Sequence, residues 1–114
     1  MSKVVNVKVK YIRPKYNNLK DWCKDKDNYY IGRKCIVIID GQRYPPKDSI
    51  FANPYKIDKD GDRDEVLEKY KIYIKSKIEN NPEILNEIKN KTLGCWCKPD
   101  KCHGDILIDI LKNF

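Results

Sequence analysis

Residues 92–111, TLGCWCKPDKCHGDILIDIL, predict a strand, a turn and a helix in direct succession. Residues 92–97 favour a short strand, and Lys98-Pro99-Asp100 is typical of a turn. The apolar residues that follow recur at helical spacing, at Ile106, Leu107, Ile110 and Leu111. A strand that leads into a helix is typical of α/β proteins, so this segment indicates the fold class.

The earlier part of the chain predicts strands and a hairpin. Residues 4–12 alternate apolar and polar side chains and predict an opening strand, whereas residues 15–28 look polar and irregular. Residues 29–31 predict a second strand. A third apolar run at residues 35–39 is followed by Asp40-Gly41, which is a strong signal for a β-hairpin.

The second half predicts helices. Asp62 and Glu65 predict the start of a helix that runs to about residue 79, and its apolar residues share one face. Asn81-Pro82 predicts a shorter helix. We therefore expect one α/β or α+β domain over residues 1–114, with a mixed sheet of about four or five strands and three helices.

The composition describes a small domain without a membrane-spanning segment. The longest uninterrupted apolar run, residues 35–39, is too short to cross a bilayer. The amino terminus lacks the apolar stretch of a signal peptide, so we expect an intracellular (cytoplasmic) protein with no membrane partner. In that compartment, the five cysteines indicate reduced thiols or metal ligands rather than disulfides.

Positive charge is concentrated in the first half of the chain. Residues 1–56 hold 13 Lys or Arg and 5 Asp or Glu, a net charge of +8, whereas residues 57–114 hold 11 and 12, a net charge of −1. This asymmetry indicates either a surface for nucleic acid or another polyanion, or a solvated lysine-rich surface.

Three of the five cysteines and the only histidine lie within residues 95–103. Cys95 and Cys97 share one face of a strand, because strand side chains alternate, and Cys102 and His103 follow at the start of the last helix. These four residues form a candidate Cys₃His zinc site, although their spacing differs from that of paired Cys-x₂-Cys knuckles.

Thiol or imidazole chemistry is the second interpretation of this junction. Unpaired N–H groups at a helix start stabilise thiolates and bind anions. Cys102 beside His103 therefore predicts a reactive thiol, and Asp105 is placed either to orient His103 or to complement the helix dipole. Cysteines that simply fill the core are the structural alternative.

Several motifs resemble the DUF4326 family, a domain of unknown function. They cover about residues 29–112 and comprise Tyr30-Ile31-Gly32-Arg33, Asn53-Pro54-Tyr55, residues 61–66 and the Cys/His segment. The last of these is more faintly similar to the DUF488 family. The resemblance implies that one pocket is shared by Arg33, Asn53, Arg63, Cys95, Cys97, Cys102, His103 and Asp105. Two arginines near a helix start suit a phosphate or carboxylate.

The chain departs from the family pattern between the first two motifs. Family members bring Ile-Gly-Arg and Gly-Asn-Pro-Phe close together, whereas residues 34–52 intervene here, and Ala52 and Tyr55 replace the glycine and the phenylalanine. We interpret residues 34–48 as an inserted hairpin that covers or reshapes the site.

Two function classes follow from these observations, and the oligomeric state is not predicted. The leading hypothesis is a small anionic, nucleotide-like ligand held by Arg33 and Arg63 and oriented by Asn53. In that case His103, with Cys102 and Asp105, would carry acid–base or nucleophilic chemistry. The alternative is a zinc-stabilised, non-catalytic module that binds nucleic acid through the positive first half. A third hypothesis is an adaptor whose hairpin edge recruits a partner strand.

Overall fold

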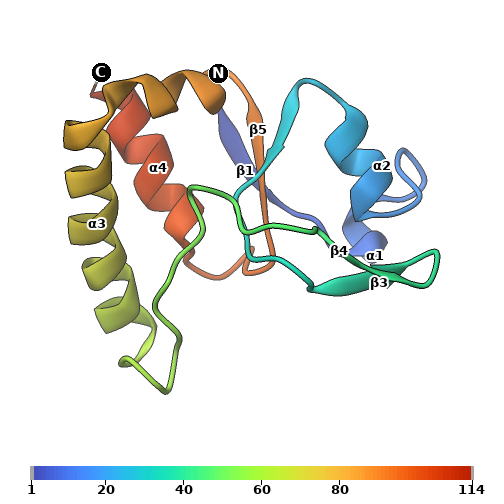
Figure 1. Ribbon diagram of the computed structural model, residues 1–114, viewed down its shortest axis with the longest axis horizontal. Helices are drawn as coiled ribbons and strands as arrows, with labels where there is room; N and C mark the ends of the chain where they lie inside the picture. Colours follow the sequence, from blue (N-terminus) through green and yellow to red (C-terminus); the bar gives the residue numbers. More distant parts are fainter. Residues whose placement is uncertain (1, 114) are drawn as a thin grey trace.

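Three parallel strands lie at the centre of the computed structural model, which describes residues 2–113 (Figure 1). β5 (Thr92–Cys95) lies between β1 (Lys3–Asn6) and β2 (Asn28–Tyr30). The register pairs Asn6 with Cys95 and Tyr30 with Gly94. The carboxyl ends of all three strands therefore meet at one edge of the sheet.

The sheet separates two buried clusters, because successive strand residues point to opposite faces. Val4 packs against the larger cluster and Val5 against the smaller one, and Tyr29 and Tyr30 divide in the same way. Among the largest fully buried side chains of the larger cluster are Tyr70, Phe51, Ile31, Ile74, Leu93 and Leu107.

The larger cluster is covered by α3 (Arg63–Asn80), the 3-10 helix η1 (Pro82–Glu87) and α4 (His103–Lys112). α4 contacts β1 and β5, and α3 packs on the outer side of α4 (Figure 1). The Asp62 carboxylate accepts a hydrogen bond from the Glu65 N–H at 2.9 Å, and Glu65 accepts one from the Asp62 N–H at 3.3 Å. This capping box confirms the predicted start of the long helix.

The smaller cluster lies on the other face, with α1 (Val9–Ile12) and α2 (Leu19–Lys24) (Figure 1). Beside them, β3 (Val37–Ile39) and β4 (Gln42–Tyr44) form the predicted antiparallel hairpin. Asp40 and Gly41 both have positive φ, 53° and 79°, as a tight two-residue hairpin turn requires.

The opening strand is shorter than the sequence predicts. β1 ends at Asn6, and Val9–Ile12 form α1 instead. The reason is long-range: β5 ends at Cys95, opposite Asn6. Asn6 then turns the chain, since its Oδ1 accepts from the Lys8 N–H at 2.9 Å and its Nδ2 donates to the Lys98 carbonyl at 2.7 Å. The predicted strand is therefore wrong in the second half of residues 4–12.

α2 corrects the prediction that residues 15–28 are irregular. Asn18 caps this helix by accepting from the Asp21 N–H at 2.8 Å, and Leu19 and Trp22 are each 2% exposed. The absence of a side chain at Gly94 lets the Trp22 ring pack against the sheet, because a Cβ on Gly94 would lie 2.5 Å from the indole. Packing against the sheet therefore stabilises a helix that is too short to be stable alone.

The α/β class is confirmed, with helices on both faces of a central sheet. Within residues 2–113, the five strands are divided between a three-stranded and a two-stranded sheet rather than joined in one mixed sheet. No helix in this part of the chain is long and apolar enough to span a bilayer.

Candidate functional site

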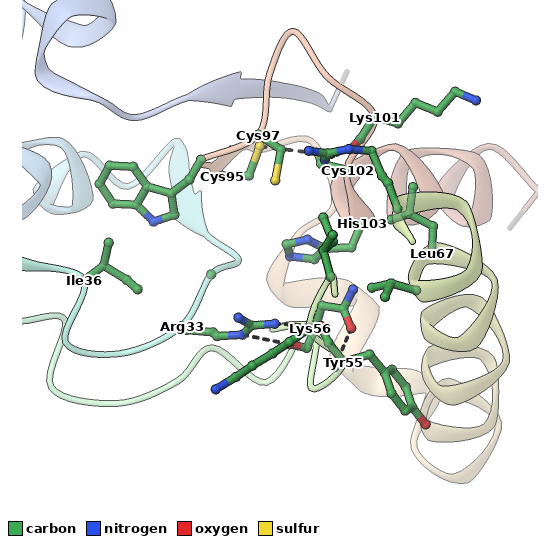
Figure 2. A pocket seen from close by; sticks show the side chains of 16 residues that line it. Arg33, Ile36, Tyr55, Lys56, Leu67, Cys95, Cys97, Lys101, Cys102 and His103 are labelled. Atoms are coloured by element: carbon green, nitrogen blue, oxygen red, sulfur yellow. Dashed lines mark hydrogen bonds between the residues drawn. The ribbon is translucent and has the colours of Figure 1, made fainter. Parts of the chain in front are cut away.

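A cavity of about 540 Å³ opens at the edge where the parallel strands end (Figure 2). The end of β5 and the start of α4 form one side, and the loop after Asn53 with the first turns of α3 forms the other. Ligands of α/β proteins commonly bind outside the carboxyl ends of parallel strands. The lining residues are Gly32, Arg33, Ile36, Asn53, Tyr55, Lys56, Ile57, Arg63, Val66, Leu67, Cys95, Trp96, Cys97, Lys101, Cys102 and His103.

Lysine and arginine side chains supply the positive charge of the cavity lining. Arg33, Lys56, Arg63 and Lys101 border it, and no Asp or Glu of residues 2–113 does so. Two of these cations pair with carboxylates outside the lining: Lys101 with Asp64 at 3.5 Å and Arg63 with Asp100 at 4.0 Å. The chain carries 17 acidic residues, and their absence from the lining leaves a positive potential in the cavity.

Arg33 is held in place by the loop that it faces. Its Nε donates to the Asn53 carbonyl at 3.0 Å, and its Nη2 donates to the Tyr55 carbonyl at 2.7 Å. The Arg33 carbonyl accepts from the Tyr30 hydroxyl at 2.8 Å, and this hydroxyl accepts from the Trp96 indole at 2.8 Å. A chain of hydrogen bonds thus links the ends of β2 and β5 to one wall of the cavity.

Asn53 shapes the same wall from a buried position. Its side chain is 8% exposed, and its Oδ1 accepts from the Tyr55 N–H at 2.9 Å. The carboxamide therefore folds the loop onto itself, which directs the carbonyls of Asn53 and Tyr55 towards Arg33.

Arg63 reaches the cavity from the first turn of α3. One guanidinium nitrogen donates to the Lys101 carbonyl at 2.8 Å, which ties α3 to the loop before α4. The Arg63 side chain is 37% exposed. The Arg63 guanidinium is therefore partly accessible to solvent.

Cys95 and Cys102 meet at the floor of the cavity, with their sulfur atoms 3.3 Å apart. The hydrogen bond from Cys102 lowers the pKa of Cys95 to about 6, helped by the backbone N–H groups of Cys97 and Lys98. The same contact, together with burial, raises the pKa of Cys102. These opposite shifts favour Cys95 as the thiolate and Cys102 as the proton donor of the pair.

His103 lies between the cysteines and the Arg33 wall (Figure 2). Its Nε2 is 2.7 Å from the Ile31 carbonyl, which can only accept, so Nε2 carries the proton. Burial lowers the pKa of His103, and the ring packs edge-on against Tyr70 at 5.1 Å between centroids. The imidazole is therefore neutral at pH 7, with Nδ1 unprotonated.

Asp105 lies outside the residues that border the cavity. Its Oδ2 accepts from the Cys102 N–H at 3.2 Å, and its Oδ1 pairs with the Lys98 ammonium. Asp105 therefore caps α4 and complements the positive end of the helix. The other seven residues of the predicted pocket border the cavity together.

The four predicted zinc ligands are near one another but do not converge. Within residues 2–113, no three His, Cys, Asp or Glu side chains are placed so that they could hold a metal ion. The His103 Nε2–H donates to the Ile31 carbonyl, which leaves Nδ1 free. The thiols of Cys95 and Cys102 contact each other, and zinc coordination by the four residues stays a prediction.

Sequence reasoning missed several residues of the site. Lys56 and Lys101 add two cations, whereas Ile57, Leu67 and Trp96 supply apolar surface. Lys56 directly follows the Asn53-Pro54-Tyr55 motif, and Lys101 directly precedes Cys102. Proximity to the motifs was therefore the only available signal, and it does not show which way a side chain points.

The chain belongs to the DUF4326 family, described as a domain of unknown function, and the family model matches residues 15–113. This confirms the resemblance drawn from the motifs. An uncharacterized protein of Acanthamoeba polyphaga mimivirus is 38% identical over 91 residues, which are 73% of this chain and 65% of that protein. The chain thus spans slightly less than two thirds of that relative. No solved structure matches it.

Proposed function

We propose that the cavity binds a small anionic ligand of nucleotide-like character. The observation that carries the proposal is the lining itself, in which four cations and no carboxylate of residues 2–113 surround one concave space. A volume of about 540 Å³ suits a small molecule. A phosphate suits this lining, because Arg63 lies in the first turn of α3, where N–H groups and a guanidinium together bind anions.

The proposed ligand has a charged part and an apolar part. Arg63, with Lys56 and Lys101, would hold the charge, whereas Arg33 fixes the loop. Ile57, Leu67 and Trp96 offer apolar surface for a ring such as a nucleobase. This combination favours a nucleotide over inorganic phosphate alone.

The floor of the cavity offers nucleophilic and acid–base groups to such a ligand. Cys95 Sγ is the nucleophile, the Cys102 thiol is a proton donor, and the unprotonated Nδ1 of His103 is a base. Asp105 supports this floor by capping α4. The surrounding cations would hold the ligand within reach of Cys95.

The experiment is isothermal titration calorimetry with a panel of nucleoside monophosphates and diphosphates and with inorganic phosphate. We expect at least one nucleotide to bind, and Arg63→Ala to weaken it by about 10- to 100-fold, as the loss of a charged hydrogen bond implies. Lys75→Ala is the matched control, because Lys75 is an exposed cation on the same helix away from the cavity.

Two outcomes would overturn the proposal: no member of the panel binds, or Arg63→Ala binds as tightly as Lys75→Ala. Thermal unfolding of both variants shows whether each is folded. Elemental analysis of the same protein distinguishes the alternative of a zinc-stabilised nucleic-acid module, which requires one zinc ion per chain.

A further inference from the structure

The first 20 residues of the chain hold six cations and no acidic residue: Lys3, Lys8, Lys10, Arg13, Lys15 and Lys20. An ordinary solvated surface carries charges of both signs. α3, for example, interleaves its lysines with acidic residues such as Asp64, Glu65 and Glu68. The excess of positive charge in residues 1–20 therefore favours a partner of opposite charge.

The structure gathers five of these cations around two hollows. They lie on or next to β1 and α1, and α1 is on the opposite side of the sheet from α3 (Figure 1). Lys8 and Lys10 border a hollow of about 660 Å³, and Lys3 and Lys15 border one of about 760 Å³. Arg13 borders both. The two hollows thus share Arg13, and we call them together the basic groove.

The positive charge of the basic groove is not neutralised within the molecule. All five cations are exposed, and none takes part in an ion pair within residues 2–113. Asp40, on the hairpin turn, is the one acidic residue that borders either hollow in this part of the chain. A polyanion that lies along the groove would meet cations over its whole length.

The groove also carries aromatic and apolar surface that a base can contact. Tyr11 is 53% exposed, and the Lys10 ammonium lies 5.0 Å from the centre of its ring. Ile38, which is 66% exposed, and Trp96 border the first hollow. Alternation of lysines with an exposed aromatic ring is the surface that unstacked bases and their phosphates recognise, whereas a duplex keeps its base faces covered.

We propose that the basic groove binds single-stranded nucleic acid, with the lysines on phosphates and Tyr11 stacked on a base. The cations of this surface differ from those of the cavity, because Arg33, Lys56, Arg63 and Lys101 do not border the groove, whereas Trp96 borders both. Either function can therefore fail without the other.

The test is fluorescence anisotropy with labelled 12-nucleotide oligo(dT) and oligo(rU), on the full chain, between 50 and 200 mM NaCl. Lys10→Glu/Lys15→Glu should weaken binding at least tenfold and flatten the salt dependence by about 1.4 in slope, the value for two phosphate contacts on a single strand. Tyr11→Ala should weaken binding about fivefold or more, as the loss of one stacked base implies.

The control is Lys71→Glu/Lys75→Glu, which makes the same change of net charge on exposed positions of α3. It should alter the affinity less than twofold. The proposal is overturned if the control weakens binding as much as the groove variant or if Tyr11→Ala has no effect. It is equally overturned if a duplex of the same length binds as tightly, or if anionic phosphatidylserine vesicles are bound and the oligonucleotides are not.

Discussion

The cavity and the basic groove are both positively charged, but their cations are held in different ways. In the cavity, Arg33 donates to the carbonyls of Asn53 and Tyr55, and Arg63 donates to that of Lys101. In the groove, Arg13 Nε donates to the Asn17 carbonyl at 3.0 Å on the exposed surface, whereas the ammonium groups of the four lysines make no hydrogen bond or ion pair within residues 2–113; these are Lys3, Lys8, Lys10 and Lys15.

This difference separates fixed charge from adaptable charge. A guanidinium bound to backbone carbonyls has one position, so it can match a small ligand of one shape. Exposed lysines on flexible stems adapt to the varying backbone of a polymer, and their attraction is screened by salt. The same net charge can thus serve geometric recognition in one region and electrostatic recognition in another.

Arg33→Ala should produce the largest effect on stability, because two charged hydrogen bonds to the loop are lost. We expect the free energy of unfolding to fall by about 2–4 kcal/mol. Arg13→Ala, in the groove, should change it by less than about 0.5 kcal/mol, since Arg13 and its single hydrogen bond to the Asn17 carbonyl are exposed to water. Urea denaturation measures both. Equal losses would mean that the arginines of the two regions are not held differently.

Cys102→Ala should make the Cys95 thiol much less reactive at neutral pH. The lowered pKa of Cys95, about 6, keeps it a thiolate at pH 7, and the hydrogen bond from Cys102 is the main cause. Without this bond the pKa of Cys95 rises, so its alkylation by iodoacetamide at pH 7 should slow about tenfold or more. The pH at which the alkylation rate of Cys95 reaches half its maximum should be higher in Cys102→Ala.

Mass spectrometry of the alkylated peptides from pH 5 to 9 gives a rate for each cysteine. Cys35 is the internal control, because it is exposed and lies outside the cavity. Its rate should be the same in both proteins. An unshifted profile for Cys95 in Cys102→Ala would show that the sulfur–sulfur contact does not set its reactivity.

Local signals in the sequence were sufficient for the elements that local interactions build. The Asp62–Glu65 capping box and the Asp40-Gly41 turn are examples, because all the partner atoms lie within a few residues. The grouping of Arg33, Asn53 and Arg63 with the Cys/His segment came from the family motifs. The structure brings these residues together where parallel strands end.

The failures have a long-range cause. Alternation in residues 4–12 continues beyond Asn6, but the length of β1 is set by β5, nearly 90 residues later in the chain. α2 depends on the fit of Trp22 against Gly94, which local spacing does not reveal. The contact between Cys95 and Cys102 was likewise not evident from the sequence, because the turn between them decides which way each thiol points.

Asp105→Ala should lower the stability of the protein, by less than Arg33→Ala does, and leave ligand binding unchanged. Asp105 caps α4 but does not border the cavity, so its removal should lower the free energy of unfolding by about 1 kcal/mol, as for other helix caps. Nucleotide affinity in calorimetry should stay within about twofold of the unmodified chain. Asp62→Ala is the control, because it removes the cap of α3 and should lower stability by a similar amount. A selective loss of affinity in Asp105→Ala would instead assign Asp105 to the site.

The smallest expected effects come from the hairpin, which touches both regions. Ile36 borders the cavity and Ile38 borders the groove, and they are 45% and 66% exposed. Loss of one such partly exposed apolar contact weakens binding about threefold, at about 0.8 kcal/mol per buried CH₂. Ile36→Ser should therefore weaken the nucleotide and spare the oligonucleotide, whereas Ile38→Ser should do the reverse. If both variants weaken the same ligand, the hairpin does not divide the two surfaces, and the cavity and the groove form one site.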